Sequence, residues 1–354
     1  MVAGVQPGRR GNRGGRHRRS SSRTADLVKD RADQREPTLR ESVPAVLVGE
    51  RIDRVVALLA DVSRSRAGDS IDRGLVSLNG VVVGLRSRRV AGGEELVVVD
   101  LGREATHVPE PDPSVAIDFL YEDDQVLVVD KPAGLVVHPG AGNLEGTLVN
   151  GLLARYPDLA GVGSAARPGI VHRLDQGTSG ALVVARTEES YASLVDQLAE
   201  RTVGRRYRAL VWGQPESAIG VVDAPIGRSG RDRTRMAVIS SGRPARTRYE
   251  QLQAWEGPPE VSLLECRLET GRTHQIRVHL SAIGHPLIGD AVYGGDRSGR
   301  PGGGQVASLE RPFLHAAHLA FDHPTGGGRI SIESPLPADL AEVLDRLGAP
   351  AVPD

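Results

Sequence analysis

Short apolar runs, several with a period of two residues, recur through the C-terminal two thirds of the chain. Such runs, bounded by glycine, proline and polar turns, predict β-strands. The clearest are VAIDFLYEDDQVLVVDKPAG (115–134, two strands around an acidic turn), GIVHRLDQGTSGALVVAR (169–186, a strand, a polar loop and a strand), RRYRALVWG (205–213), TRYEQLQAW (247–255) and VSLLECRLE (261–269). The pattern therefore predicts one strand-rich domain over residues 115–348.

Two segments of this domain have the spacing of amphipathic helices instead. Residues 188–201 follow a candidate N-cap, Thr187, and residues 273–284 form a shorter helix. The apolar face of the first helix comprises Tyr191, Leu194, Val195 and Leu198. Because helices and strands do not alternate regularly, we expect an α+β fold, with a largely antiparallel mixed β-sheet flanked by helices and loops.

A smaller unit is expected over residues 45–102. Residues 50–62 have helical spacing, and residues 64–74 predict a second helix with Ser63 as N-cap and Gly74 at its end. Asn-Gly in LVSLNGVVV (75–83) is a strong signal for a two-residue hairpin, because both residues tolerate positive φ. RRVAGGEELVVVD (88–100) adds a last strand.

This small unit resembles an RNA-binding module first seen in a small-subunit ribosomal protein. The resemblance rests on Arg51–Asp53, Ser63–Ser65 and Gly74–Gly80. The helices also carry several arginines, which form either a basic RNA-binding face or an ordinary solvated surface. These are Arg51, Arg54, Arg64, Arg66 and Arg73.

Charge is segregated although the formal net charge is only −1. Residues 1–23 contain seven arginines and no acidic residue, so we expect a disordered arm that is either an RNA-binding extension or a solvated tail. Residues 24–44 complete this arm as a linker. Residues 103–114, which include Pro109, Pro111 and Pro113, form a second expected linker.

Composition excludes several classes of protein. The single cysteine, Cys266, rules out an intrachain disulfide framework and a cysteine-built zinc site, and favours a cytoplasmic protein. The sequence contains no apolar run of about 18 residues, so no membrane-spanning helix is expected. The N-terminal segment lacks the apolar core of a signal peptide.

Common catalytic and cofactor motifs are also missing from the sequence. His274 and His279 are five residues apart, about 500° of helical rotation, so their rings do not share a face for a metal. The chain has no HExxH, no GxSxG around Ser179 and no GxxxxGK[ST]. We therefore expect no metal site.

The polar loop at 172–178 contains Asp175, with Arg173 two residues before it. By itself Asp175 is either a turn residue or a reactive carboxylate. Tyr207 is a rare aromatic among arginines and suits contact with a base, although it also suits a core position. A cluster of Arg272, His274 and Arg277 at the start of a helix is either a site or a buried structural network.

Longer motifs carry a resemblance to a known family. HRLDQGTSGALVVAR (172–186) resembles the signature of the large-subunit ribosomal RNA pseudouridine synthases of the RluA/RluD type. VVDKPAGLVVHPG (128–140), RYRALVWG (206–213), GRPARTRYE (242–250), LETGRTHQIRVHLSAIGHPLIGDAVYGG (268–295) and LHAAHLAFDHP (314–324) resemble its other motifs in the same order. Gln176 departs from the pattern, because the family often has lysine there.

The resemblance implies an isomerase that converts uridine in RNA to pseudouridine without a cofactor or metal. By the same resemblance, Asp175 is the catalytic aspartate, Tyr207 lies against the target base, Arg277 is the basic partner of Asp175, and Arg173 helps to hold the flipped nucleotide. Large-subunit (23S) ribosomal RNA is the expected substrate and partner. The alternatives are a transfer RNA pseudouridine synthase and a non-catalytic RNA-binding or ribosome-assembly protein.

Overall fold

The structure is a computed structural model that describes residues 38–60, 62, 64–101, 108–140, 143–230, 232, 235–294, 304, 306 and 309–350. The chain divides into two compact units, residues 1–106 and 107–354. The arginine-rich segment 1–23 and the expected N-cap Ser63 lie outside the described residues. Within those residues, no helix has both the length and the apolar character needed to cross a membrane.

The first unit has the expected two helices and hairpin. Its elements are β1 (Leu39–Ser42), the short η1 (Ala45–Leu47), α2 (Ile52–Leu59), α3 (Arg64–Asp72), β2 (Val76–Leu78), β3 (Val81–Val82) and β4 (Glu95–Val98). The four strands form one antiparallel sheet in the order β1-β4-β2-β3. Strand β1 lies in the segment that the sequence analysis assigned to a linker, so the compact unit begins before residue 45.

Residues with positive φ form two turns of this unit. Asn79 and Gly80 have φ values of 49° and 75°, as a two-residue hairpin turn requires. Gly74 has φ 70° and ends α3, with its N–H bonded to the carbonyl of Ile71 and the next N–H bonded to the carbonyl of Ser70. Both turns were predicted from the sequence, because each depends on a local residue preference.

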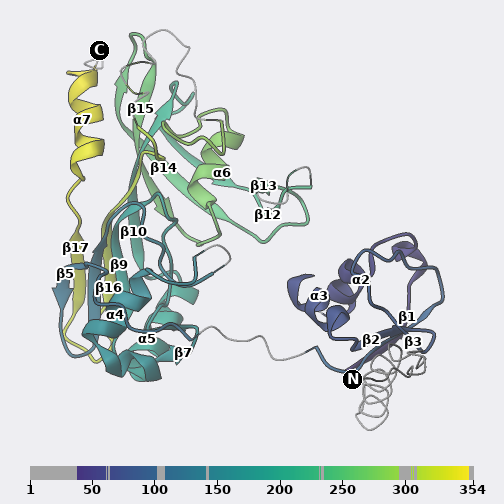
Figure 1. Ribbon diagram of the computed structural model, residues 1–354. Coiled ribbons are helices and arrows are strands. Elements are labelled where there is room, and N and C mark those ends of the chain that lie inside the picture. Colours follow the sequence, from purple (N-terminus) through teal and green to yellow (C-terminus); the bar gives the residue numbers. More distant parts are fainter. Residues whose placement is uncertain are drawn as a thin grey trace, which may run out of the picture. The chain divides into compact units, whose positions relative to one another are not determined.

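The second unit is built on a nine-stranded sheet in the order β11-β14-β15-β10-β16-β9-β6-β5, with β17 paired to β16 (Figure 1). The strands are β5 (Asp118–Glu122), β6 (Val126–Lys131), β9 (Ser179–Ala185), β10 (Gly204–Trp212), β11 (Ile219–Asp223), β14 (Arg246–Trp255), β15 (Val261–Leu268), β16 (Leu314–Asp322) and β17 (Arg329–Glu333). Among the described strands of this sheet, only the β9–β16 pair is parallel. The expected α+β fold with a largely antiparallel mixed sheet is confirmed.

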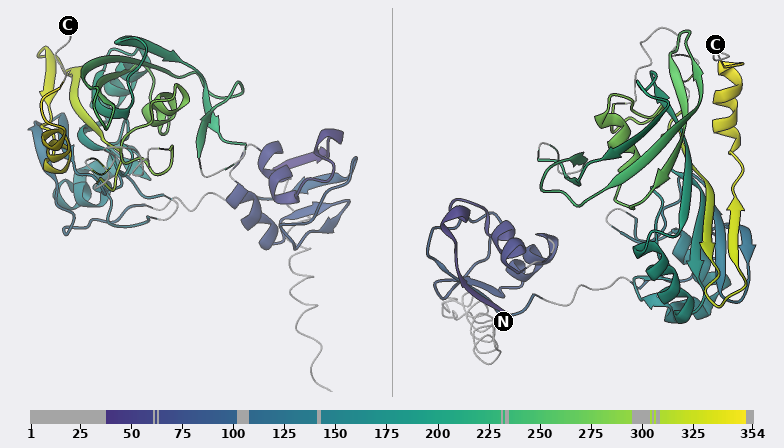
Figure 2. Two further views of the ribbon diagram at one scale, coloured as in Figure 1. Left: turned by 90° about the horizontal axis from the view of Figure 1, so that it is seen from above. Right: turned by 180° about the vertical axis from the view of Figure 1, so that it is seen from behind.

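Helices and short ribbons surround this sheet. They are α4 (Leu148–Arg155), η2 (Pro157–Gly161), α5 (Glu188–Ala199), α6 (Gln275–Ala282), α7 (Ala338–Leu347), the β7–β8 pair (Gly163–Ser164 and Arg167–Pro168) and the β12–β13 hairpin (Ile226–Arg228 and Met236–Val238). Helix α5 packs against β9 and β16. Helices α6 and α7 lie on opposite sides of β14 and β15 (Figure 2).

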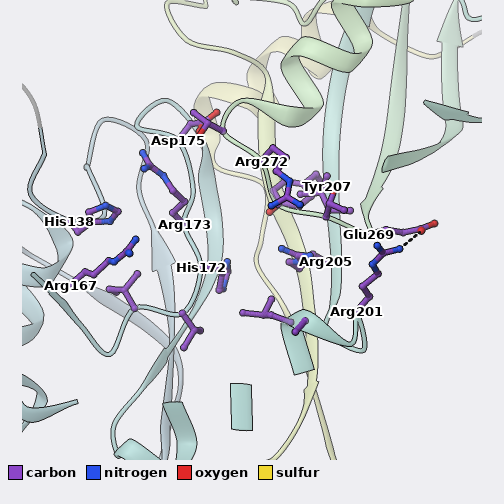
Figure 3. A pocket seen from close by; sticks show the side chains of 18 residues that line it. His138, Arg167, His172, Arg173, Asp175, Arg201, Arg205, Tyr207, Glu269 and Arg272 are labelled. Carbon is purple, nitrogen blue, oxygen red and sulfur yellow. Dashed lines mark ion pairs between the residues drawn. The ribbon is translucent and has the colours of Figure 1, made fainter. Parts of the chain in front are cut away.

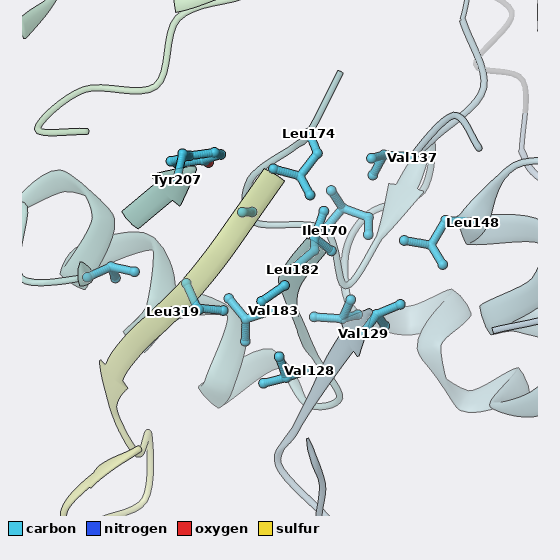
Figure 4. Close-up of a cluster of buried hydrophobic side chains, with 14 of the residues drawn as sticks. Val128, Val129, Val137, Leu148, Ile170, Leu174, Leu182, Val183, Tyr207 and Leu319 are labelled. Atoms are coloured by element: carbon cyan, nitrogen blue, oxygen red, sulfur yellow. The ribbon is translucent and has the colours of Figure 1, made fainter. Parts of the chain in front are cut away.

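The largest core lies between the central strands and the helices that cover them. All seven residues of β9 are buried, as a continuous apolar run predicts for a strand covered on both faces. Val128 and Val129 of β6 face Val183 and Leu182 of β9 across the ladder, inside the cluster shown in Figure 4. This rigid core supports the polar loop that precedes β9.

The first strand expected in residues 169–186 does not form. Only an isolated bridge joins Ile170 to Val184, because the N–H of Val183 donates to Nε2 of the His172 side chain, at 3.1 Å, instead of to a backbone carbonyl. The chain then leaves the sheet. Residues 171–178 consequently form a loop, closed by a hydrogen bond from the N–H of Thr178 to the carbonyl of Asp175.

Candidate active site

Asp175, Tyr207 and Arg277 come from three separate elements and meet in one place. Asp175 lies in the loop before β9, Tyr207 on β10, and Arg277 on the first turn of α6. Nη1 of Arg277 is 3.5 Å from Oδ2 of Asp175, and the Asp175 side chain is 17% exposed. Asp175 and Tyr207 line the same pocket. The structure therefore brings together three of the four residues that the resemblance singled out, and the fourth, Arg173, lines the same pocket as Asp175 and Tyr207.

A second carboxylate fixes the direction of Arg277. Nε and Nη2 of Arg277 donate to the two oxygens of Asp290 at 2.7 and 2.9 Å, and Asp290 is fully buried. The guanidinium also lies 4.9 Å from the ring centre of Tyr293. With two nitrogens held by Asp290, the remaining Nη1 faces Asp175. No sequence pattern indicated Asp290, because its contact with Arg277 arises only in the folded chain.

Two basic side chains, those of Lys131 and Arg311, hold the loop that carries Asp175. Lys131 is fully buried and donates to the carbonyls of Pro132 and Leu135 at 2.7 and 2.8 Å, and more weakly to that of Gln176 at 3.4 Å. Burial lowers the pKa of Lys131 to about 7. Arg311 donates to the carbonyl of Gly177 at 3.2 Å. These bonds pre-organise the backbone around the carboxylate.

Gln176, which departs from the family pattern, has a structural contact here. Its side-chain N–H donates to the carbonyl of Gly134 at 3.1 Å, and the N–H of Gly134 donates back to the carbonyl of Gln176. The amide thus ties the loop to the segment that follows β6. Its neutral side chain removes one positive charge from this edge of the site.

Tyr207 forms one wall of the pocket and is only 5% exposed. Burial raises its pKa to about 12, so the phenol remains neutral at physiological pH. The β10–β16 pairing shifts register between Arg206 and Arg208, opposite Tyr207. Such irregularities re-aim side chains near functional sites.

The pocket has a volume of about 450 Å³ and is strongly basic (Figure 3). Its cationic or imidazole side chains are His138, Arg167, His172, Arg173, Arg201, Arg205 and Arg272. Its acidic side chains are Asp175 and Glu269. Arg173 is exposed at this surface, which agrees with a role at the rim. His138, Arg167 and Arg205 were not predicted as site residues. The two-residue period of a strand could have indicated Arg205, because it places Arg205 on the same face as Tyr207.

The polar cluster at the start of α6 is both a structural network and part of the site. Nδ1 of His274 lies 2.7 Å from the hydroxyl of Tyr293, and its Nε2 is 4.0 Å from Oδ1 of Asp175. Burial lowers the pKa of His274. His279 instead bonds Thr247 and the carbonyl of Ala224. No group of three potential metal ligands occurs among the residues with described coordinates.

Comparison with known proteins agrees with this geometry. A family model described as RNA pseudouridylate synthase matches residues 125–282. Two "Ribosomal large subunit pseudouridine synthase D" proteins are similar over most of their length. The Nitrosomonas europaea protein is 46% identical and covers 89% of this chain and 90% of its own. The Zymomonas mobilis protein is 43% identical and covers 86% and 96%.

A solved structure, the human RNA pseudouridylate synthase domain containing 1, is 28% identical with a TM-score of 0.50. It covers 69% of this chain and 100% of its own. An RNA pseudouridine synthase of Chloroflexus aurantiacus is 48% identical over 86% of this chain and 92% of its own. The similarity to these curated relatives confirms the predicted resemblance: the chain belongs to the RNA pseudouridine synthase family, and it is an RNA-modifying isomerase of that family.

Proposed function

We propose that this enzyme converts uridine to pseudouridine in large-subunit (23S) ribosomal RNA, in the cytoplasm. The observation that carries the proposal is that Asp175, which pairs with Arg277, lines the same basic pocket as Tyr207. The names of the Nitrosomonas europaea and Zymomonas mobilis relatives support large-subunit ribosomal RNA rather than transfer RNA. A non-catalytic RNA-binding protein would have no need for this partly buried, pre-organised carboxylate.

The reaction is an isomerisation and balances without a co-reactant. The bond between N1 of uracil and C1′ of ribose breaks, a bond between C5 and C1′ forms, the proton on C5 leaves, and N1 gains a proton. We assign Asp175 as the catalytic carboxylate, with the positive charge of Arg277 at 3.5 Å from it. The target uridine must leave its stack to reach this group, at a cost of a few kcal/mol.

Tyr207 and Arg173 are assigned to hold the flipped nucleotide. The neutral ring of Tyr207 forms a buried wall against which a pyrimidine can pack. Arg173, exposed near Asp175, can contact the backbone of the flipped residue or the gap that it leaves. Neither role requires a metal or a cofactor.

Mapping pseudouridine in RNA tests the assigned substrate. We expect a strain that lacks this protein to lose pseudouridine at one or more positions of 23S ribosomal RNA, and the purified protein to restore it in vitro. Loss confined to transfer RNA would replace the proposal with the alternative substrate. An unchanged pseudouridine map would contradict both.

The first unit is assigned to RNA binding, although its helical arginines already have partners. Arg51 and Arg64 both pair with Asp53, and Arg54 pairs with Glu50. These arginine side chains are 42–46% exposed. The Arg54–Glu50 pair is exposed on both sides and contributes only about 0–1 kcal/mol, so an RNA phosphate can replace Glu50. Asp53 is only 7% exposed, so Arg51 and Arg64 would contact phosphates while they stay paired with it.

Deleting residues 1–105 is therefore expected to weaken RNA binding and to reduce its dependence on salt. The deletion retains every residue assigned to the reaction, so the maximal rate on saturating RNA should stay within about tenfold of the full-length value. Deleting residues 1–23 should have a milder effect of the same kind. The measurements are RNA affinity over a salt series and single-turnover rates. A salt slope unchanged in both deletions would show that neither segment contacts RNA.

A further inference from the structure

Arg205 is a buried cation for which the described part of the chain provides no counter-ion. It is the second residue of β10 and is 8% exposed. Its Nε is buried without a hydrogen-bond partner, and within the described residues its guanidinium makes no ion pair. Burial lowers the pKa of Arg205. Arginine is rarely buried unless an anion pairs with it, so we expect this side chain to bind an anion from outside the protein.

A second hydrogen-bond donor lies beside it. Burial and the charge of Arg205 lower the pKa of His172 to about 3, so the imidazole is neutral. Its Nε2 accepts the N–H of Val183, which places the ring proton on Nδ1. Both side chains line the 450 Å³ pocket (Figure 3). The two residues therefore offer only donors to whatever enters.

Apart from Asp175, the acidic residue that lines this pocket is Glu269, and it already has partners. Oε1 of Glu269 accepts a 2.6 Å hydrogen bond from Arg248, and Oε2 lies 3.8 and 3.6 Å from Arg201 and Arg246. A Cβ added at Gly271 would lie 3.0 Å from Nη1 of Arg205, so the absence of a side chain keeps the guanidinium accessible. An anion that carries only acceptor atoms matches this arrangement.

We propose that Arg205 and the Nδ1–H of His172 form a subsite for one backbone phosphate of the RNA strand that contains the target uridine. This inference rests on the proposed function. Arg205 lies two residues from Tyr207 on the same face of β10, about 7 Å along the strand, so it contacts a part of the RNA other than the ring that packs on Tyr207. A phosphodiester supplies both the negative charge and the acceptor oxygens. A uracil carbonyl would leave the buried charge uncompensated.

The test replaces single phosphates of a 23S ribosomal RNA fragment with neutral methylphosphonates. Each modified linkage carries a 2′-O-methyl group, and the matched RNA has the 2′-O-methyl group with a normal phosphate. Affinity is measured for the wild-type protein, Arg205→Met, Arg205→Lys and the control Arg206→Met. Arg206 is the next residue and lines a different pocket on the opposite face of β10. Thermal unfolding verifies that each variant is folded.

We expect one linkage near the target at which neutralisation weakens wild-type binding about tenfold or more. At that linkage Arg205→Met should bind both RNAs within about twofold, Arg205→Lys should retain part of the difference, and Arg206→Met should retain all of it. Equal sensitivity in Arg205→Met and the wild type would overturn the subsite, as would a wild type insensitive at every linkage. Turnover of the unmodified fragment separately tests the proposed function, because the affinities do not depend on it.

Discussion

Replacing Asp175 with asparagine is expected to abolish pseudouridine formation while leaving the fold and RNA binding largely unchanged. Asparagine has nearly the same size but lacks the negative charge that the reaction requires. The bidentate Arg277–Asp290 pair does not depend on Asp175, so the site should keep its shape. We expect the single-turnover rate to fall at least about 10⁴-fold. RNA affinity should stay within about threefold, and thermal unfolding should verify the fold.

The matched control is Asp124→Asn, which removes a carboxylate whose side chain is fully exposed on the turn between β5 and β6. It should keep the wild-type rate. Asp175→Ala complements the test, because alanine cannot be converted back to aspartate by deamidation. Measurable turnover by purified Asp175→Ala would remove Asp175 from the chemical step. A lower rate in Asp124→Asn would instead show that a change in the protein's net charge alone affects the reaction of bound RNA.

Local patterns predicted much of the fold because they depend on few neighbours. The Asn79-Gly80 turn and the N-cap of α5, where Thr187 accepts the N–H of Ser190 at 3.1 Å, follow directly from residue preference. The strand expected at residues 169–171 does not form because of a contact between separate segments. The N–H of Val183 donates to the His172 side chain instead of to a backbone carbonyl. The prediction of the apolar face of α5 was only partly correct, because Val195, one of its four predicted members, is 38% exposed.

The site was less predictable than the fold. The resemblance identified Asp175, Tyr207 and Arg277 as a set, but no sequence pattern indicated that Asp290 would orient Arg277. The arginines of the first unit illustrate the same limit. Their spacing suggested a basic face, whereas folding brings acidic partners such as Asp53 within 3.1 Å. Pairing between separate segments depends on the folded arrangement and not on local composition.

Replacing Arg277 with lysine is expected to slow the reaction strongly, even though the positive charge remains. The planar guanidinium donates through Nε and Nη2 to Asp290 and presents Nη1 to Asp175 at the same time. A lysine ammonium is a single point of charge and cannot hold both carboxylates in these positions. We expect the single-turnover rate to fall by about 10²–10³-fold, with RNA affinity changed less than about fivefold.

Two further variants separate orientation from charge. Arg346→Lys makes the same substitution on α7, where the arginine is 40% exposed and lies 3.9 Å from Glu342, and it should leave the rate unchanged. Asp290→Asn keeps Arg277 but removes the anion that fixes its direction, so it should lower the rate and destabilise the fold, because Asp290 is fully buried. If Arg277→Lys reacted at the wild-type rate, charge alone would suffice beside Asp175. Asp290 also accepts hydrogen bonds from the backbone N–H groups of Val292 and Tyr293. If only Asp290→Asn slowed the reaction, Asp290 would therefore support the site through these backbone bonds and not by orienting Arg277.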